Sequence, residues 1–153
     1  MYTNNMSYMD EALKEAYEGI NKNHGGPFGS VIVKNGKIIG RGHNCVLLKG
    51  DPTCHGEMEA IRDACKNLGT HDLSGSILYT TAEPCPMCFG GILWANIVKI
   101  YFGCNIKDTS KIGFRDEIFY NAYEKRENIA EEQDRDKCLK LFDYYNNLNA
   151  GRY

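Results

Sequence analysis

A histidine, a glutamate and two cysteines stand at spacings that suit a metal-dependent reaction. His55 and Glu57 are two residues apart, and Cys85 and Cys88 follow further along in the stretch Pro-Cys-Pro-Met-Cys. Imidazole nitrogen and thiolate sulfur are ligands that Zn²⁺ prefers, and a carboxylate beside a metal-bound water can act as a base. Three protein ligands with an open fourth position are typical of a catalytic zinc site. The four residues therefore indicate metal-assisted chemistry on water.

Charge balance assigns the roles within this group. Two thiolates already neutralise Zn²⁺, so Glu57 is better suited to move protons than to bind the metal. Cys85 and Cys88 are three residues apart at the expected start of a helix, which puts both sulfurs on one side and favours the thiolate form. Zinc lowers the pKa of a bound water from about 15.7 to about 7. We predict one Zn²⁺ per subunit, bound by His55, Cys85 and Cys88.

The same residues also fit simpler interpretations. A lone His-x-Glu arises easily by chance, and a Cys-x-x-Cys pair alone fits a redox pair or half of a structural zinc site. A structural zinc protein without turnover is thus the alternative from another class. The chain has seven cysteines, and this odd number argues against a disulfide framework.

Length and composition favour a single soluble domain. The chain has 153 residues, of which 42% are hydrophobic and 25% are charged. A net charge of −2 gives no general attraction to nucleic acid, so we expect no polynucleotide substrate. No secretory signal is visible at the start and no apolar stretch is long enough to span a membrane, which predicts a cytoplasmic protein.

Hydrophobic periodicity predicts alternating helices and strands. The expected elements, in chain order, are a helix after Ser7, strands at 28–34 and 37–42 around the turn Asn35-Gly36, a helix from Thr53 to about 68, a strand at 76–81, a helix from 84–86 to about 95, and a strand at 97–103. Further on we expect a polar loop at 105–114, a strand or short helix at 116–123 and a helix at 129–148.

Strand–helix–strand passages of this kind imply right-handed crossovers and mostly parallel later strands. The expected fold is an α/β three-layer α-β-α sandwich with a mixed five-stranded sheet, in one domain covering residues 1–153. If the helices near Thr53 and Cys85 start at the same edge of the sheet, then His55, Cys85 and Cys88 converge there, where ligands gather in such sheets.

Several stretches carry a resemblance to a known family. They are Gly25-Gly26-Pro27-Phe28-Gly29, Gly42-His43-Asn44, Asp51-Pro52-Thr53, residues 55–61, residues 83–88 and Trp94-Ala95. With them the chain resembles the cytidine deaminase-like superfamily. Gly113-Phe114-Arg115-Asp116, the aromatics Phe119 and Tyr120, and the terminal tyrosine are similar to the branch of bacterial guanine deaminases.

The resemblance implies hydrolytic deamination of guanine to xanthine and ammonia, with Glu57 as proton carrier. It further implies that Asp116 helps to protonate the departing amine, and that Asn44, Phe28, Trp94 and Tyr153 bind the base. It also implies a homodimer acting on a small nucleobase, and the chain is compatible with a swap of segment 124–153 onto the partner subunit.

Each of these residues has a simpler interpretation as well. Asn44 is also a turn former, Phe28 and Trp94 also fit a hydrophobic core, and Tyr153 also fits a frayed end. Guanosine, cytosine, an aminotriazine and adenosine in tRNA remain alternative substrates. The chain departs from the family pattern at Cys54, Gly56 and Arg115, and Gly56 predicts a first helical turn that is either looser or more closely approached.

Overall fold

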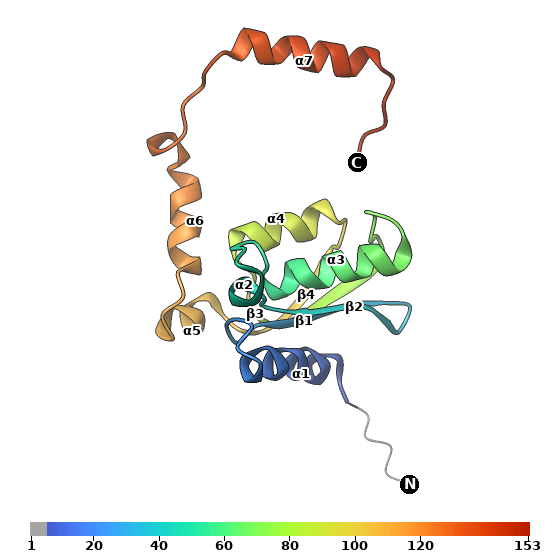
Figure 1. Cartoon of the computed structure of the whole chain (residues 1–153), viewed down its shortest axis with the longest axis vertical. Coiled ribbons are helices and arrows are strands. Elements are labelled where there is room, and N and C mark those ends of the chain that lie inside the picture. The colour runs from blue at the N-terminus through green and yellow to red at the C-terminus, as the bar shows by residue number, and fades with distance from the viewer. Residues whose placement is uncertain (1–5) are drawn as a thin grey trace. The chain divides into compact units, whose positions relative to one another are not determined.

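The computed structural model describes residues 6–153 as alternating strands and helices (Figure 1). Their bounds are α1 Tyr8–Asn21, β1 Gly29–Lys34, β2 Lys37–His43, α2 Val46–Lys49, α3 Gly56–Leu68, β3 Ser76–Ala82, α4 Pro86–Trp94, β4 Lys99–Cys104, α5 Ile106–Lys111, α6 Asp116–Glu124, the 3₁₀ turn η1 Arg126–Asn128 and α7 Arg135–Asn147. None of these helices, within residues 6–153, is long and apolar enough to cross a membrane.

The sheet has the strand order β2-β1-β3-β4. Strand β1 runs antiparallel to both neighbours, and β3 and β4 are parallel. The hairpin predicted at Asn35-Gly36 joins β1 to β2, and both turn residues have positive φ. The mixed α/β sheet predicted from the sequence is confirmed, although residues 6–153 contain four strands and not five. The stretch 116–123, which fitted either a strand or a helix, belongs to the helix α6.

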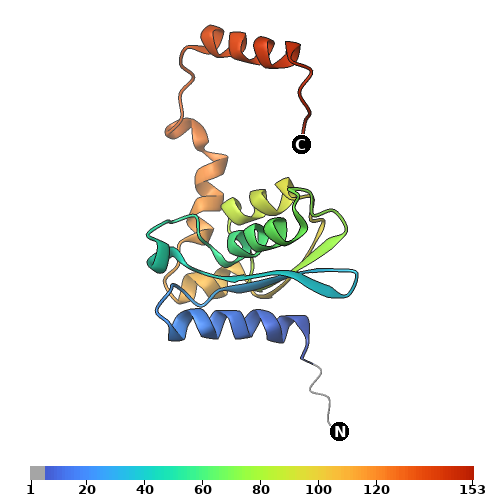
Figure 2. The ribbon, with the colours of Figure 1, turned by 45° about the vertical axis from the view of Figure 1, so that its right-hand side comes forward.

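Helices cover both faces of this sheet. Helix α1 lies on one face, and α3 and α4 lie on the other, in both views of the ribbon (Figures 1 and 2). The core between the sheet and α3 and α4 is built from fully buried side chains such as Ile32, Leu78 and Ile92. Each such side chain stabilises the fold by about 1.5–3 kcal/mol relative to exposure. The layered core fixes where the helices begin.

Small residues bring α3 very close to β2. A Cβ atom on Gly40 would lie 2.5 Å from the carbonyl oxygen of Ala60, and one on Gly42 would lie 2.6 Å from the nitrogen of Ala60. Ala60 and Ala64, which are fully buried, supply the matching small surface on the helix. This contact fixes the position of α3 along the sheet, and with it the helix start that carries His55 and Glu57.

Helix α3 begins later than the sequence predicted. Thr53 was the expected N-cap, but the cap is His55. The Asp51 side chain accepts hydrogen bonds from both the backbone nitrogen and the hydroxyl of Thr53, at 2.8 and 2.7 Å. This turn engages the Thr53 hydroxyl and holds the chain out of the helix. His55 therefore stands at the start of the helix, as its N-cap.

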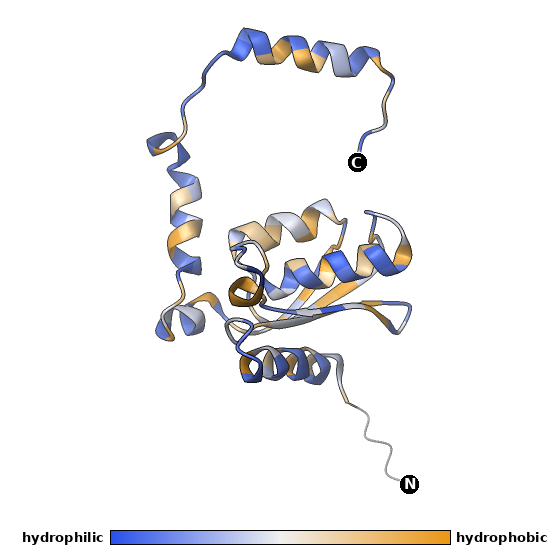
Figure 3. Ribbon diagram, viewed as in Figure 1, coloured by the Kyte–Doolittle hydropathy of each residue, from blue (hydrophilic) through white to orange (hydrophobic). Residues whose placement is uncertain are grey.

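The chain divides into two compact units, residues 1–120 and 121–153. In the second unit α7 begins at Arg135, later than the predicted position 129, because Asp134 before it has a φ of 54°. Blue and orange stretches alternate along α7 in Figure 3, as expected of an amphipathic helix. Tyr145 donates a hydrogen bond to the carbonyl of Gly151 at 2.8 Å, which ties the chain end to α7. The single domain and the swap of segment 124–153 stay predictions.

Candidate active site

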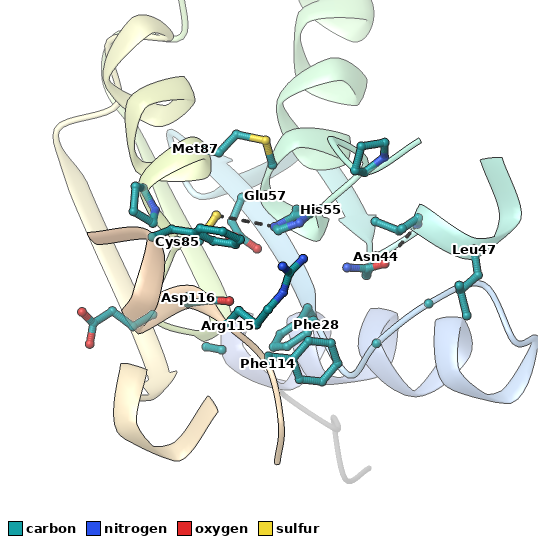
Figure 4. A pocket seen from close by; sticks show the side chains of 18 residues that line it. Phe28, Asn44, Leu47, His55, Glu57, Cys85, Met87, Phe114, Arg115 and Asp116 are labelled. Carbon is teal, nitrogen blue, oxygen red and sulfur yellow. Dashed lines mark hydrogen bonds between the residues drawn. The ribbon is translucent and has the colours of Figure 1, made fainter. Parts of the chain in front are cut away.

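A cavity of about 640 Å³ lies at the edge of the sheet where β1 begins and β2 and β3 end. Its size falls within the range of small-molecule sites. The lining residues come from the loops before β1 and after β2, from the starts of α3 and α4, and from the segment before and within α6; they include Phe28, Asn44, His55, Glu57, Cys85, Phe114, Arg115, Asp116 and Phe119. Figure 4 shows the side chains that line this pocket.

The three expected metal ligands converge at this edge. His55 is the N-cap of α3, Cys85 is the N-cap of α4, and Cys88 lies in the first turn of α4. Their donor atoms all lie within 4.8 Å of one another. The separation of Cys85 Sγ from His55 Nδ1 is 3.6 Å, and tetrahedral zinc with bonds of about 2.1 and 2.3 Å requires about the same separation. The donor set therefore fits zinc in both chemistry and spacing.

Interactions at the start of α4 favour the thiolate form of Cys85. The hydrogen bond with Cys88 lowers the pKa of Cys85 to about 4, against the opposing effect of burial, and His55 lowers it further. The same hydrogen bond, followed by burial, raises the pKa of Cys88. The hydrogen bond with Cys85 raises the pKa of His55. Cys85 is thus the thiol that ionises first, in contact with the imidazole.

Glu57 lies buried in the first turn of α3, with an exposed fraction of 5%. Its Oε1 lies 3.5 Å from the hydroxyls of both Ser30 and Thr80, and Ser30 donates a 2.9 Å hydrogen bond to Thr80. Burial raises the pKa of Glu57 above its ordinary value. A carboxyl group with a raised pKa suits a residue that must both take up and release a proton near neutral pH.

Asp116 faces the same cavity from the start of α6. Burial, followed by the negative charge of Cys85, raises the pKa of Asp116. Tyr120, one turn along α6, donates a 2.6 Å hydrogen bond to the carbonyl of Pro84, directly before the ligand Cys85. This bond ties α6 to the start of α4 and keeps the second acid beside the metal ligands.

Asn44 and Phe28 line the pocket on the side of β1 and β2. Asn44 Oδ1 accepts a 3.0 Å hydrogen bond from the backbone of Val46, and the amide nitrogen is directed toward the pocket centre in Figure 4. Asn44 is therefore a turn residue and a pocket residue at once. The Phe28 ring meets Phe114 edge to face at 4.9 Å. These residues form a wall with one polar donor and two aromatic rings.

The substrate-binding roles of Trp94 and Tyr153 stay predictions. Trp94 ends α4, is 68% exposed and is not among the residues that line the pocket. Tyr153 belongs to the second compact unit. Gly56 stands where a Cβ would come within 3.1 Å of the Phe28 carbonyl, so the first turn of α3 is closely approached and not loose. Cys54, beside the ligand His55, is buried, and burial raises its pKa.

Three residues of the site were not found from the sequence. Arg115 directs its guanidinium toward the middle of the pocket in Figure 4 and lies over the Phe119 ring at 5.1 Å. Ser30 and Thr80 contact Glu57 from two neighbouring strands. In the sequence, Ser30 and Thr80 could be noticed only as hydroxyl residues within stretches that were predicted to be strands.

Comparison with known proteins agrees with this geometry. Residues 2–104 match the family model described as the cytidine and deoxycytidylate deaminase zinc-binding region. Guanine deaminase from Bacillus subtilis is 45% identical over 122 residues, which cover 80% of this chain and 78% of that protein. An X-ray structure of guanine deaminase from the same organism matches with a TM-score of 0.90 and 39% identity, covering 99% of both chains.

A second kind of deaminase is also similar. The tRNA-specific adenosine deaminase from Buchnera aphidicola subsp. Schizaphis graminum is 37% identical over 142 residues, which cover 92% of this chain and 93% of that protein. The resemblance inferred from the sequence is thus confirmed at the level of fold, zinc-binding region and enzyme class. The imidazole and the two thiols converge beside a buried glutamate, as a catalytic zinc site requires, and the family model matches the region that contains them. This chain therefore belongs to the cytidine and deoxycytidylate deaminase family of zinc-dependent hydrolases.

Proposed function

We propose that the chain catalyses the hydrolytic deamination of guanine to xanthine and ammonia. The observation that carries this proposal is the match to guanine deaminase from Bacillus subtilis along 99% of the chain, through both compact units. A cavity of about 640 Å³ has the size of a small-molecule site and can hold a single base.

The acids of the pocket divide the proton transfers between them. When zinc is bound by His55, Cys85 and Cys88, it supplies a polarised water as the nucleophile. Glu57 takes a proton from the attacking water and delivers it to the ring nitrogen of the base. Asp116, which faces the same cavity from the start of α6, helps to protonate the amine as it leaves. Both carboxyl groups have raised pKa values, which favours this exchange of protons.

The hydrogen-bond donors of the pocket wall match the O6 and N7 edge of guanine, which does not carry the amine. Guanine presents the acceptors O6 and N7 there, whereas adenine presents a donor beside N7. Arg115 and Asn44 bring donors to the pocket, and Phe28 and Phe114 offer ring surfaces. A guanidinium pairs with two acceptors and is repelled by the adenine amine. Arg115 therefore favours guanine over adenine.

Deamination of adenosine in tRNA is the second candidate. It is favoured by the Buchnera relative, whose match covers 92% of this chain. Binding to RNA requires cationic groups that neutralise phosphates and makes affinity fall steeply with salt. The net charge of −2 supplies no such general attraction. A zinc protein without turnover is the third possibility, and it predicts no ammonia from any substrate.

The proposal extends to the assembly. We expect a homodimer in which segment 124–153 covers the partner's pocket, with one catalytic zinc per subunit. All seven cysteines are free thiols in the structure, which supports a reducing compartment such as the cytoplasm. The molar mass in solution and the zinc content of the isolated protein test the first two statements.

Ammonia release across a set of substrates tests the choice of base. Zinc-loaded protein is assayed with guanine, guanosine, cytosine, an aminotriazine and tRNA, and guanine should give the highest kcat/KM. Arg115→Gln should raise KM for guanine about 5–150-fold, equivalent to about 1–3 kcal/mol of lost base discrimination. Arg62→Gln, altered at an exposed side chain of α3 that does not line the pocket, is the matched control. Release of ammonia from tRNA but not from guanine would contradict the proposal and support deamination of adenosine in tRNA.

A further inference from the structure

A second group of metal-ligating side chains lies outside the catalytic trio. His24, His43 and Cys45 place one donor atom each within 4.8 Å of the others. Cys45 is buried, and both histidines are partly buried. His24 stands in the loop before β1, His43 ends β2, and Cys45 follows as the N-cap of α2.

The two imidazoles are aimed at each other. His24 Nδ1 lies 2.8 Å from His43 Nε2, and the rings stack at 5.1 Å with an interplanar angle of 21°. Only one proton fits between two nitrogens at that distance, so one of them presents a lone pair. A tetrahedral metal with bonds of about 2.05 Å requires a separation of about 3.3 Å. The rings therefore need to move apart by about 0.5 Å to bind a metal together.

A buried carboxylate orients the inner histidine. Glu15 Oε2 lies 2.9 Å from His43 Nδ1, and Glu15 is itself held by Arg41 at 3.1 Å. This contact keeps the proton on Nδ1 and leaves Nε2 as the ligand atom, which is the carboxylate–histidine arrangement of metal sites. Gly19 packs so closely that a Cβ there would lie 2.6 Å from the His43 ring. The ring is thus fixed by a charge on one side and by backbone on the other.

We propose that His24, His43 and Cys45 form a second site for a divalent transition metal, with zinc as the natural match for two imidazoles and a thiolate. On binding, His43 keeps its Nδ1 proton on Glu15, and His24 moves its ring proton from Nδ1 to Nε2. Cys45 releases its thiol proton to solvent. The metal gains bonds to two nitrogens and one sulfur, and one proton is released for each ion bound.

This site would fix one wall of the pocket. Asn44 lies between the ligands His43 and Cys45 in sequence, and the carbonyl of the ligand His24 accepts hydrogen bonds from Leu47 and Leu48 at 2.9 and 3.0 Å. A metal there joins the loop before β1 to the segment after β2. Given the proposed function, its loss should raise KM for guanine more than it lowers kcat, because Asn44 binds and does not react.

Metal content tests the site without relying on activity. The full-length chain is loaded with Zn²⁺, freed of excess by gel filtration and analysed by elemental mass spectrometry. Wild type should retain about two equivalents per chain and His24→Gln about one. His71→Gln alters an exposed histidine elsewhere and should retain about two. A wild type that retains about one equivalent, equal to His24→Gln, overturns the proposal and leaves a histidine pair that is only hydrogen-bonded.

Cobalt gives a second measurement that reports sulfur directly. In Co²⁺-loaded protein the thiolate-to-metal absorption should fall by about a third in Cys45→Ser, because one of three thiolates is lost. Cys138→Ser, altered at an exposed position, should leave it unchanged. Equal absorption in Cys45→Ser and wild type contradicts the site. If the proposed function alone fails, guanine turnover is absent while the difference between His24→Gln and His71→Gln persists.

Discussion

Glu57 combines burial with hydroxyl contacts that are weak for a carboxylate. Its nearest hydroxyl partners lie at 3.5 Å, which is long for a hydrogen bond to a charged oxygen. Ser30 and Thr80 are instead bonded to each other at 2.9 Å. The two hydroxyls therefore surround the carboxyl group but stabilise its charged form only weakly. Such a group can exchange a proton with a bound reactant.

Replacement of Glu57 by glutamine should separate metal binding from turnover. Glu57→Gln keeps the shape of the side chain but removes its capacity as a base, so kcat should fall about 10²–10⁴-fold. Zinc content should stay as in wild type, because the proposed ligands are His55, Cys85 and Cys88. Glu117→Gln alters the neighbouring acid of Asp116, which pairs with Lys107, and serves as the control. Unchanged kcat in Glu57→Gln would remove this residue from the mechanism.

At the scale of elements, the contact between α3 and β2 determines where the reactive side chains lie. Gly40 and Gly42 on the strand face Ala60 and Ala64 on the helix with no room for a methyl group. Because the contact is backbone to backbone, a shift of α3 cannot be absorbed by a change of rotamer. Any displacement of the helix is transmitted to His55 and Glu57 at its start.

Gly40→Ala should therefore destabilise the fold and disturb the site together. The added methyl group meets Ala60 and Ala64 at 2.5–2.6 Å, and overpacking of this kind costs about 1–3 kcal/mol of unfolding free energy. Gly90→Ala in α4 is the matched change, because a Cβ there meets nothing within 4 Å. It should stabilise the helix by about 0.5–1 kcal/mol. The free energy of unfolding of zinc-loaded Gly40→Ala and Gly90→Ala is measured in urea. Equal values for the two variants would contradict the close contact between β2 and α3.

Local signals predicted most of these elements. The hairpin at Asn35-Gly36 and the helix start at Cys85-Pro86 follow from backbone preferences of a few adjacent residues. The start of α3 did not, because a side chain two residues before Thr53 turned the chain aside. Helix α5 lay in a predicted loop, although its cap Asn105 and the acid Asp108 form a capping box that the sequence contains.

The sequence indicated the three candidate ligands, and the resemblance added two acids and two wall residues that the structure brings to the same pocket. His55, Cys85 and Cys88 each stand at a helix start, and the order of strands and helices brings those starts together. Arg115 and the hydroxyls around Glu57 come from distant parts of the chain, and no local pattern marks their approach. The spacing of the histidine, glutamate and cysteines thus indicated the class of reaction. The shape of the pocket depends on contacts between residues that are distant in the sequence.

For the whole molecule, metal ligands from two separate helices link zinc to stability. His55 begins α3, and Cys85 and Cys88 begin α4, so an ion bound by all three would join two elements of the layered core. A ligand that binds only the folded state stabilises it by about 4 kcal/mol when its concentration is 1,000 times Kd.

Removal of zinc should lower the Tm of the full-length protein by about 8–16 °C, from about 4 kcal/mol at about 2–4 °C per kcal/mol. The measurement is thermal unfolding after dialysis against a chelator, followed by addition of Zn²⁺ to restore the Tm. Dialysis against the chelator already saturated with zinc is the control. The same Tm with and without metal would show that the ion does not join the two helices in the folded state.

The origin of the two sets of pocket residues has an evolutionary consequence. The reacting groups stand at the starts of helices, whereas much of the wall, including Asn44, Pro52 and Arg115, comes from connecting segments. Connecting segments accept substitutions and insertions that a core does not. Substrate preference can therefore drift through changes in these segments while the chemical step is inherited intact. A short insertion after Asn44 should then serve as a starting point for selecting deaminases of other amino-substituted rings.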